Sequence, residues 1–153
     1  MEWFSVALRC HHPAWDPNQV SSALGMTPKI AWGVGELRRT PDGELLGGKY
    51  ENTYWCSQDL DGFSGDPVGT LAKYLDILER KRSSIQAIVG TGGRLEFFVG
   101  WGLGGPSDGE ELGSGLLRRL GDLSIDLSLC VYEQIRGGSR PSEPTVAQGP
   151  LVL

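Results

Sequence analysis

The sequence holds one glycine pattern that resembles a phosphate-binding loop. Gly100, Gly102 and Gly105 fit the spacing G-x-G-x-x-G, after a predicted strand and before a predicted helix. Such loops bring backbone N–H groups to a phosphate at a helix N-terminus. Pro106 and several further residues separate the glycines from the predicted helix, and no Lys-Ser or Lys-Thr pair follows, which excludes a P-loop. We favour a plain loop and keep as the alternative function a nucleotide-binding or small-ligand-binding domain that uses Gly100–Gly105, with or without enzymatic activity.

Histidine and cysteine offer few other groups for catalysis. Cys10, His11 and His12 are adjacent, but neighbouring side chains of a strand point to opposite faces, so the two histidines cannot ligate one ion without a bend. As nucleophiles, Cys56 and Cys130 need a base within reach, and a Cys130–His11 pair requires the first and last strands to be neighbours. We therefore predict no metal, no cofactor and no catalytic residue, and expect buried, reduced thiols.

Aromatic and charged residues around a predicted hairpin form the candidate binding surface. The hairpin is predicted from the strands at 29–38 and 52–58, and it carries Trp32 and Trp55 close to Arg38. Large aromatic side chains beside arginine are typical of the residues that dominate binding energy at protein interfaces. The alternative is that both tryptophans pack beneath helices as part of the core. The residues predicted to bind a protein partner are Trp32, Glu36, Arg38, Tyr54 and Trp55.

Charge and composition limit the class of partner. The chain has 153 residues, a net charge of -5 and a pI near 5.0. An acidic balance argues against nucleic acid or an anionic membrane as the main partner and suits a basic protein. We see no signal peptide and no stretch near the roughly 20 apolar residues that span a bilayer, so we expect a cytoplasmic protein. A small acidic protein without a catalytic set is also typical of an immunity protein or inhibitor that neutralises a basic toxin.

Hydrophobic periodicity predicts one α+β domain over residues 1–136. Alternating segments at 3–10, 29–38, 52–58, 94–101 and 123–131 predict five strands, and Asp-Pro starts at Asp16 and Asp66 predict two of three helices. The expected order is βαββαβαβ, with three helices on one face of a mixed, mostly antiparallel sheet and a ferredoxin-like order in the first six elements. Residues 137–153, rich in Gly, Pro and Ser, are expected to form a flexible tail.

Three local features complete these expectations. Five apolar residues of the last predicted strand alternate from Leu123 to Val131, so we expect this strand to be buried on one face. The run Ile85–Val89 fits either the end of the long second helix or a short strand. The glycine-containing stretch 40–48 is expected to be a loop, and Ser107 or Asp108 is expected to cap the third helix.

Several short segments stand in a specific order along the chain. They are Asp16-Pro17, Leu24-Gly25-Met26-Thr27-Pro28, Trp32-Gly33-Val34-Gly35-Glu36, Tyr54-Trp55 and the closing stretch from Leu116 to Tyr132. In this order and spacing they resemble a bacterial family, the domain-of-unknown-function family 4279, over residues 3–133. The resemblance implies a small cytoplasmic α+β domain and no assigned activity.

Overall fold

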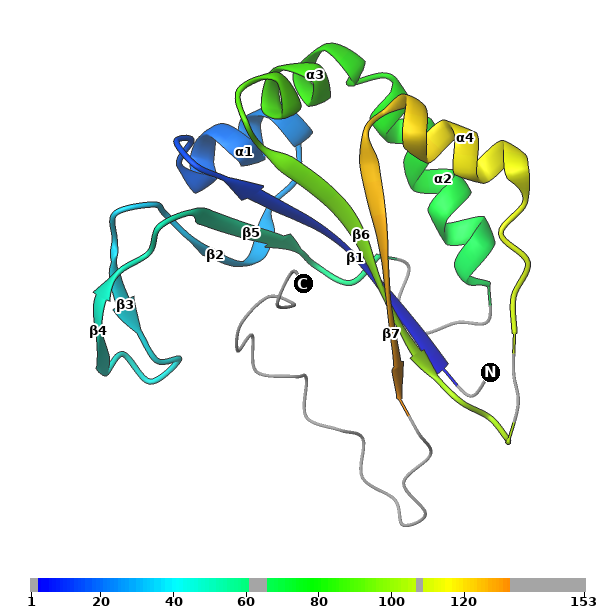
Figure 1. Ribbon diagram of the computed structural model, residues 1–153, viewed down its shortest axis with the longest axis horizontal. Helices are drawn as coiled ribbons and strands as arrows, with labels where there is room; N and C mark the ends of the chain where they lie inside the picture. Colours follow the sequence, from blue (N-terminus) through cyan, green and yellow to red (C-terminus); the bar gives the residue numbers. More distant parts are fainter. Residues whose placement is uncertain (1–2, 61–65, 107–108, 133–153) are drawn as a thin grey trace.

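A mixed five-stranded sheet lies at the centre of the computed structural model, which describes residues 3–60, 66–106 and 109–132 (Figure 1). The sequence-based expectation of an α+β fold is confirmed. The elements, in chain order, are β1 (Trp3–His12), α1 (Pro17–Leu24), β2 (Pro28–Trp32), β3 (Leu37–Arg39), β4 (Leu45–Lys49), β5 (Thr53–Ser57), α2 (Pro67–Glu79), α3 (Arg82–Gly90), β6 (Arg94–Gly102), α4 (Ser114–Asp122) and β7 (Ile125–Tyr132).

The strands of the main sheet follow the spatial order β2-β5-β1-β6-β7. β1 pairs antiparallel with both β5 and β6, and β2 pairs antiparallel with β5. β7 pairs parallel with β6, and α4 makes the crossover between these two strands. The sheet is therefore mostly antiparallel, with β2 and β7 at its edges.

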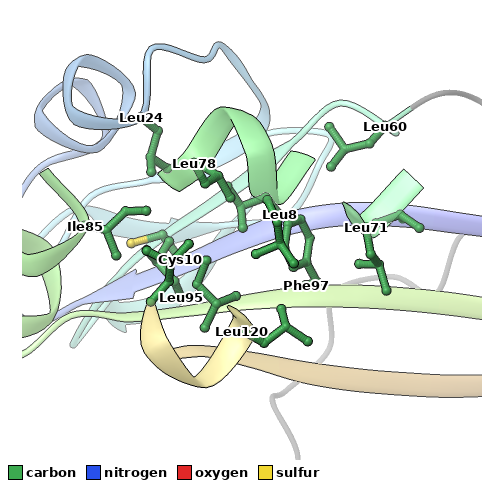
Figure 2. Packing of buried hydrophobic residues seen from close by; sticks show 14 of the residues in the cluster. Leu8, Cys10, Leu24, Leu60, Leu71, Leu78, Ile85, Leu95, Phe97 and Leu120 are labelled. Carbon is green, nitrogen blue, oxygen red and sulfur yellow. The ribbon is translucent and has the colours of Figure 1, made fainter. Parts of the chain in front are cut away.

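All four helices cover the same face of the sheet (Figure 1). Alternate residues of β1, from Phe4 to Cys10, join alternate residues of β6 in one buried cluster with apolar residues of every helix (Figure 2). Period-two alternation in the strands and helical spacing in α2 produce these matching apolar faces. The helix-side contributions include Leu24 of α1, Leu71, Leu75 and Leu78 of α2, Ile85 and Ile88 of α3, and Leu120 of α4.

The structure corrects the predicted number and order of elements. The described residues form four helices where three were predicted, because the long helix ends at Glu79 and a second one, α3, starts at Arg82 and buries its own apolar residues. The predicted loop 40–48 contains β4, which pairs with β3 in a separate two-stranded ribbon around a turn at Gly43 (φ 88°). The ferredoxin-like order of the first six elements is therefore not reproduced in full, since this ribbon and α3 interrupt it.

The last strand is less buried than its alternation predicted. Leu123 and Ile125 are buried, but Leu129 and Val131 are 53% and 58% exposed. The strand also begins at Ile125 rather than at residue 123. The C-terminal part of β7 is exposed because β7 is an edge strand and the four helices extend over only part of its length (Figure 1).

Local sequence signals correctly predicted the boundaries of α1. The Asp16 carboxylate accepts hydrogen bonds from the backbone N–H groups of Asn18 (2.8 Å) and Gln19 (2.9 Å), and the Gln19 side chain accepts one from the Asp16 N–H (2.9 Å). Gly25 ends the helix in the left-handed region, at φ 66°. For the third predicted helix, residues 107–108 lie outside the described residues, as does the tail 137–153, and α4 starts only at Ser114.

Loss of the cap at Asp16 is expected to destabilise the domain moderately. The Asp16→Ala substitution removes the acceptor for two backbone N–H groups, and we expect the free energy of unfolding to fall by about 1 kcal/mol. Urea denaturation followed by circular dichroism measures this change. Ser22→Ala, at an exposed position of the same helix, is the control and is expected to cause no loss. Equal stability of Asp16→Ala and the wild type would contradict the role of the cap.

Candidate functional site

The face of the sheet opposite the helices carries a second, distinct set of side chains. Ala7, Tyr54 and Cys56 form a separate buried cluster there, with Ile30 and Trp32 packed against it. None of the four described helices contributes to this cluster. We call this side the open face. The strand pairings place the following residues on the open face: Arg9, His11, Ile30, Trp32, Tyr54, Cys56, Arg94, Glu96, Phe98, Asp126 and Ser128.

A row of four rings runs across one end of the open face. Trp32 stacks on Tyr50 on one side (4.8 Å between centroids) and on Tyr54 on the other (4.5 Å). Tyr54 meets the ring of His11 edge-on at 5.1 Å. The pairing of the strands explains this row, because Trp32 and His11 both lie directly opposite Tyr54, from β2 and β1. We call Tyr50, Trp32, Tyr54 and His11 the aromatic row.

A charged cluster centred on Glu96 adjoins the aromatic row. Glu96 is only 6% exposed, and its Oε2 accepts hydrogen bonds from Arg94 Nη2 (3.1 Å) and from the Ser128 hydroxyl. Arg94 Nε also donates to Asp126 Oδ2 at 2.7 Å. The other oxygen, Glu96 Oε1, lies 3.9 Å from Arg9 Nη1, which is beyond hydrogen-bond distance. Two arginines therefore offset a nearly buried carboxylate.

Arg9 connects the charged cluster to the aromatic row. Its guanidinium carbon lies 3.5 Å from the centre of the Phe98 ring, a cation–π arrangement, and its side chain is 22% exposed. Within the described part of the chain, Arg9 Nε and Tyr54 Oη are buried and make no hydrogen bond. An unsatisfied buried polar atom costs free energy, and because these two atoms are buried, a partner would contact the exposed part of the Arg9 side chain and not its Nε.

Burial sets the protonation states of three groups on the open face. Burial raises the pKa of Tyr54 and of the Cys56 thiol, so both keep their protons near neutral pH. Burial also lowers the pKa of His11, and this outweighs the opposing effect of Glu96, so the imidazole is neutral. Among residues 3–60, 66–106 and 109–132 there is no group of three or more His, Cys, Asp or Glu side chains that could hold a metal ion. Tyr54, Cys56 and His11 are therefore uncharged near neutral pH and offer rings and hydrogen-bonding groups on this face.

Comparison with known protein families identifies the chain. A family model described as a domain of unknown function, DUF4279, matches residues 2–134. The chain belongs to the DUF4279 family. No curated protein and no solved structure matches it. In the described residues of this DUF4279 domain, the helices are all too short or too polar to cross a membrane.

The DUF4279 domain brings together only part of the predicted binding residues. Trp32 and Tyr54 stack on the open face, as described above. Trp55 faces the helices instead, is fully buried, and donates a hydrogen bond from its indole nitrogen to the Ser21 hydroxyl (2.9 Å). Glu36 lies in the turn after β2 and Arg38 in β3, both exposed and away from the charged cluster.

Sequence reasoning did not select Tyr50, Arg9, Glu96, Phe98 or Ser128 for the site. The alternation of β1 and β6 contained a usable signal, because it set Arg9 and Glu96 apart from the apolar face of each strand. Their contact depends on the pairing of β1 with β6, in which Arg9 lies opposite Glu96. Tyr50 follows β4, a strand that the sequence did not predict.

Two glycines of the predicted motif, Gly100 and Gly102, lie against side chains of β1. Gly100 and Gly102 lie within β6, where a Cβ at position 102 would stand 2.2 Å from Trp3 Nε1. The Trp3 ring crosses this part of the strand and packs at 5.3 Å from the ring of Tyr132. The next helix starts at Ser114, nine residues after Gly105. Close approach of this indole thus explains Gly102, and the Ser5 hydroxyl, 2.7 Å from a Cβ at position 100, explains Gly100, whereas a Cβ at Gly105 would meet nothing within 4 Å.

The two histidines lie on opposite faces, as the alternation predicted. His12 is fully buried on the helix side, where its Nδ1 accepts hydrogen bonds from the backbone N–H groups of Ala14 (3.0 Å) and Trp15 (2.8 Å). Its Nε2 therefore carries the proton and donates to the Thr91 hydroxyl oxygen at 2.9 Å. His12 thus connects the chain after β1 to the end of α3. A nucleophilic pair of His11 with a cysteine of β7 does not form either, since β6 separates these strands.

Proposed function

We propose that the DUF4279 domain is a non-enzymatic module that binds a protein partner through its open face. The observation that carries this proposal is the aromatic row, with the partly exposed side chain of Arg9 on the same face of the sheet. Tryptophan, tyrosine and arginine are the residues that most often dominate binding energy in protein interfaces. In this binding mode Trp32, Tyr50 and Arg9 contact the partner directly, and Tyr54 supports the ring of Trp32.

The stacked rings are held in place before any partner arrives. Trp32 lies between Tyr50 and Tyr54, with interplanar angles of 17° and 25°, and remains partly exposed. A side chain that is already fixed loses little conformational entropy on binding, so more of its contact energy contributes to affinity. Arg9 is positioned in the same way by Phe98. This surface therefore supports rigid recognition.

The β3–β4 ribbon extends the apolar surface beyond the aromatic row. Leu37, Leu45 and Leu46 are 49%, 63% and 54% exposed, and the ribbon projects from the body of the domain (Figure 1). The ribbon leads into Tyr50 of the aromatic row, and its exposed leucines add apolar area that a bound partner would cover. The net charge of -5 favours a basic partner. This charge supports a role as an immunity protein or inhibitor.

Affinity capture from the native host, followed by calorimetry with the purified partner, tests the proposal. We expect Trp32→Ala to weaken binding by about 30-fold or more, equivalent to about 2 kcal/mol, because the ring at the centre of the row is lost. The control is Gln86→Ala, at an exposed position of α3 on the helix side, for which we expect unchanged affinity. A partner bound equally well by both variants would contradict the proposal.

A further inference from the structure

The two edges of the main sheet differ in how they are protected against pairing with another chain. At one edge, β2 is five residues long, contains Pro28 and Lys29, and has a register shift after Pro28. Proline, lysine and irregular register are the usual devices that prevent edge-to-edge association. At the other edge, β7 has eight residues, neither proline nor lysine, and an unbroken register with β6. Among the strands of the described residues, none pairs with the outer side of β7.

Two of the three exposed side chains of β7 are apolar and lie on its helix side. Leu129 and Val131 are 53% and 58% exposed and follow the buried Ile125 in alternation. The one charged side chain of the strand, Asp126, is held on the open face by Arg94 at 2.7 Å. A long, regular, apolar edge strand that carries no free charge is a strong template for strand pairing.

The backbone of the same residues faces outward. The carbonyl of Tyr132 accepts a hydrogen bond from the Leu103 N–H (3.1 Å), which places this carbonyl on the β6 side. Because backbone groups alternate in direction along a strand, those of Val131 and Leu129 point away from β6. The residues with exposed apolar side chains thus also present the free N–H and C=O groups of the edge.

We propose that two copies of this chain associate through their β7 edges, as antiparallel strands about a two-fold axis perpendicular to the sheet. We favour a second copy as the partner of β7 because a two-fold axis of this kind makes the edge complementary to itself. The helices of both copies then lie on the same side of the combined sheet. The apolar helix-side residues of one copy then meet the same residues of the other. The two sheets become one continuous sheet, and the inference is independent of the function proposed for the open face.

The side chains specify a register for this pairing. With Leu129 on the axis, opposite its own copy, Leu127 lies opposite Val131 of the second copy, so the exposed apolar residues cover each other. On the open face, Ser128 lies opposite Cys130 of the second copy and Asp126 opposite Tyr132. No two like charges face each other in this register, whereas opposed like charges would destabilise it.

Sedimentation velocity of the purified chain tests this pairing. We expect a dimer for the wild type at the concentrations used for NMR, and a monomer for Leu129→Lys, which places two ammonium groups opposite each other on the axis. The matched control is Leu45→Lys, another exposed leucine, which is expected to stay dimeric because β4 is not at this edge. A monomeric wild type, or equal loss of the dimer in both variants, would overturn the inference.

A cysteine cross-link tests the register without relying on the folding of the lysine variant. In a Cys130→Ser background, Leu129→Cys is expected to form a covalent dimer on mild oxidation, because paired residues on adjacent antiparallel strands have Cα atoms about 5.5 Å apart. Leu45→Cys in the same background is expected to remain uncross-linked. Cross-linking of Leu45→Cys at the same rate, or none of Leu129→Cys, would contradict the proposed pairing.

Discussion

Replacement of Trp55 by alanine is expected to lower the free energy of unfolding by about 3–5 kcal/mol. The side chain is fully buried between the sheet and the helices, and its indole N–H donates to the Ser21 hydroxyl. The substitution removes the largest buried side chain, leaves a cavity that the rigid sheet cannot close, and removes the donor to Ser21. Urea denaturation followed by circular dichroism measures the loss.

The matched control for this prediction is Trp32→Ala on the opposite face. Trp32 is partly exposed and makes two ring stacks, so its removal is expected to cost about 1–2 kcal/mol. The two variants thus separate a core tryptophan from a surface one. If Trp55→Ala were no less stable than Trp32→Ala, the assignment of Trp55 to the core would be wrong.

Replacement of His12 by alanine is expected to destabilise the domain by about 2–4 kcal/mol. The imidazole accepts two backbone hydrogen bonds, donates a third to Thr91 and stacks on Trp15 with centroids 4.9 Å apart. Without the ring, the N–H groups of Ala14 and Trp15 lose their acceptor at the start of the connection to α1. The midpoint of urea denaturation at neutral pH measures this effect.

The pH dependence of stability gives His12 a second signature. Burial lowers its pKa below the ordinary value of 6.5, so the unfolded chain binds the proton more readily than the folded one. The stabilising contribution of the neutral ring is therefore complete above pH 6.5 and declines as the pH falls below it. We expect the wild type to lose stability between pH 7.5 and pH 5.5, and His12→Ala to lose less.

His11→Ala is the control for this pH dependence. The pKa of His11 is also lowered by burial. His11→Ala therefore removes the contribution of His11 to the pH dependence of stability and keeps the contribution of His12. An identical pH dependence in His12→Ala and the wild type would show that the buried ring does not titrate as the geometry requires.

Local signals in the sequence were sufficient for most of the secondary structure. Asp16 and Gly25 define α1 because a cap and a left-handed stop act within a few residues of the chain. The alternation of β5 also separated Tyr54 and Cys56 from Trp55, as the structure shows. By contrast, the short, mainly apolar run 85–89 fits a helix and a strand equally well. Only its packing beside α2 and β6 selects the helix α3.

The site depends on information that is not local. Arg9 and Glu96 face each other only because β1 pairs with β6, and sequence alternation gives the face of a residue without its neighbour on the next strand. The same limit explains the error at Leu129 and Val131. Their alternation is regular, but whether a helix covers them depends on the position of β7 at the edge.

The indole N–H resonances of the five tryptophans offer the most direct test of the open face as a binding surface. A two-dimensional NMR spectrum of the labelled domain, recorded with and without the captured partner, reports on each indole separately. We expect the Trp32 signal to shift on binding, and the Trp55 signal, which arises from the buried donor to Ser21, to stay in place. An unchanged Trp32 signal in a saturated complex would contradict the proposal that the aromatic row binds the partner.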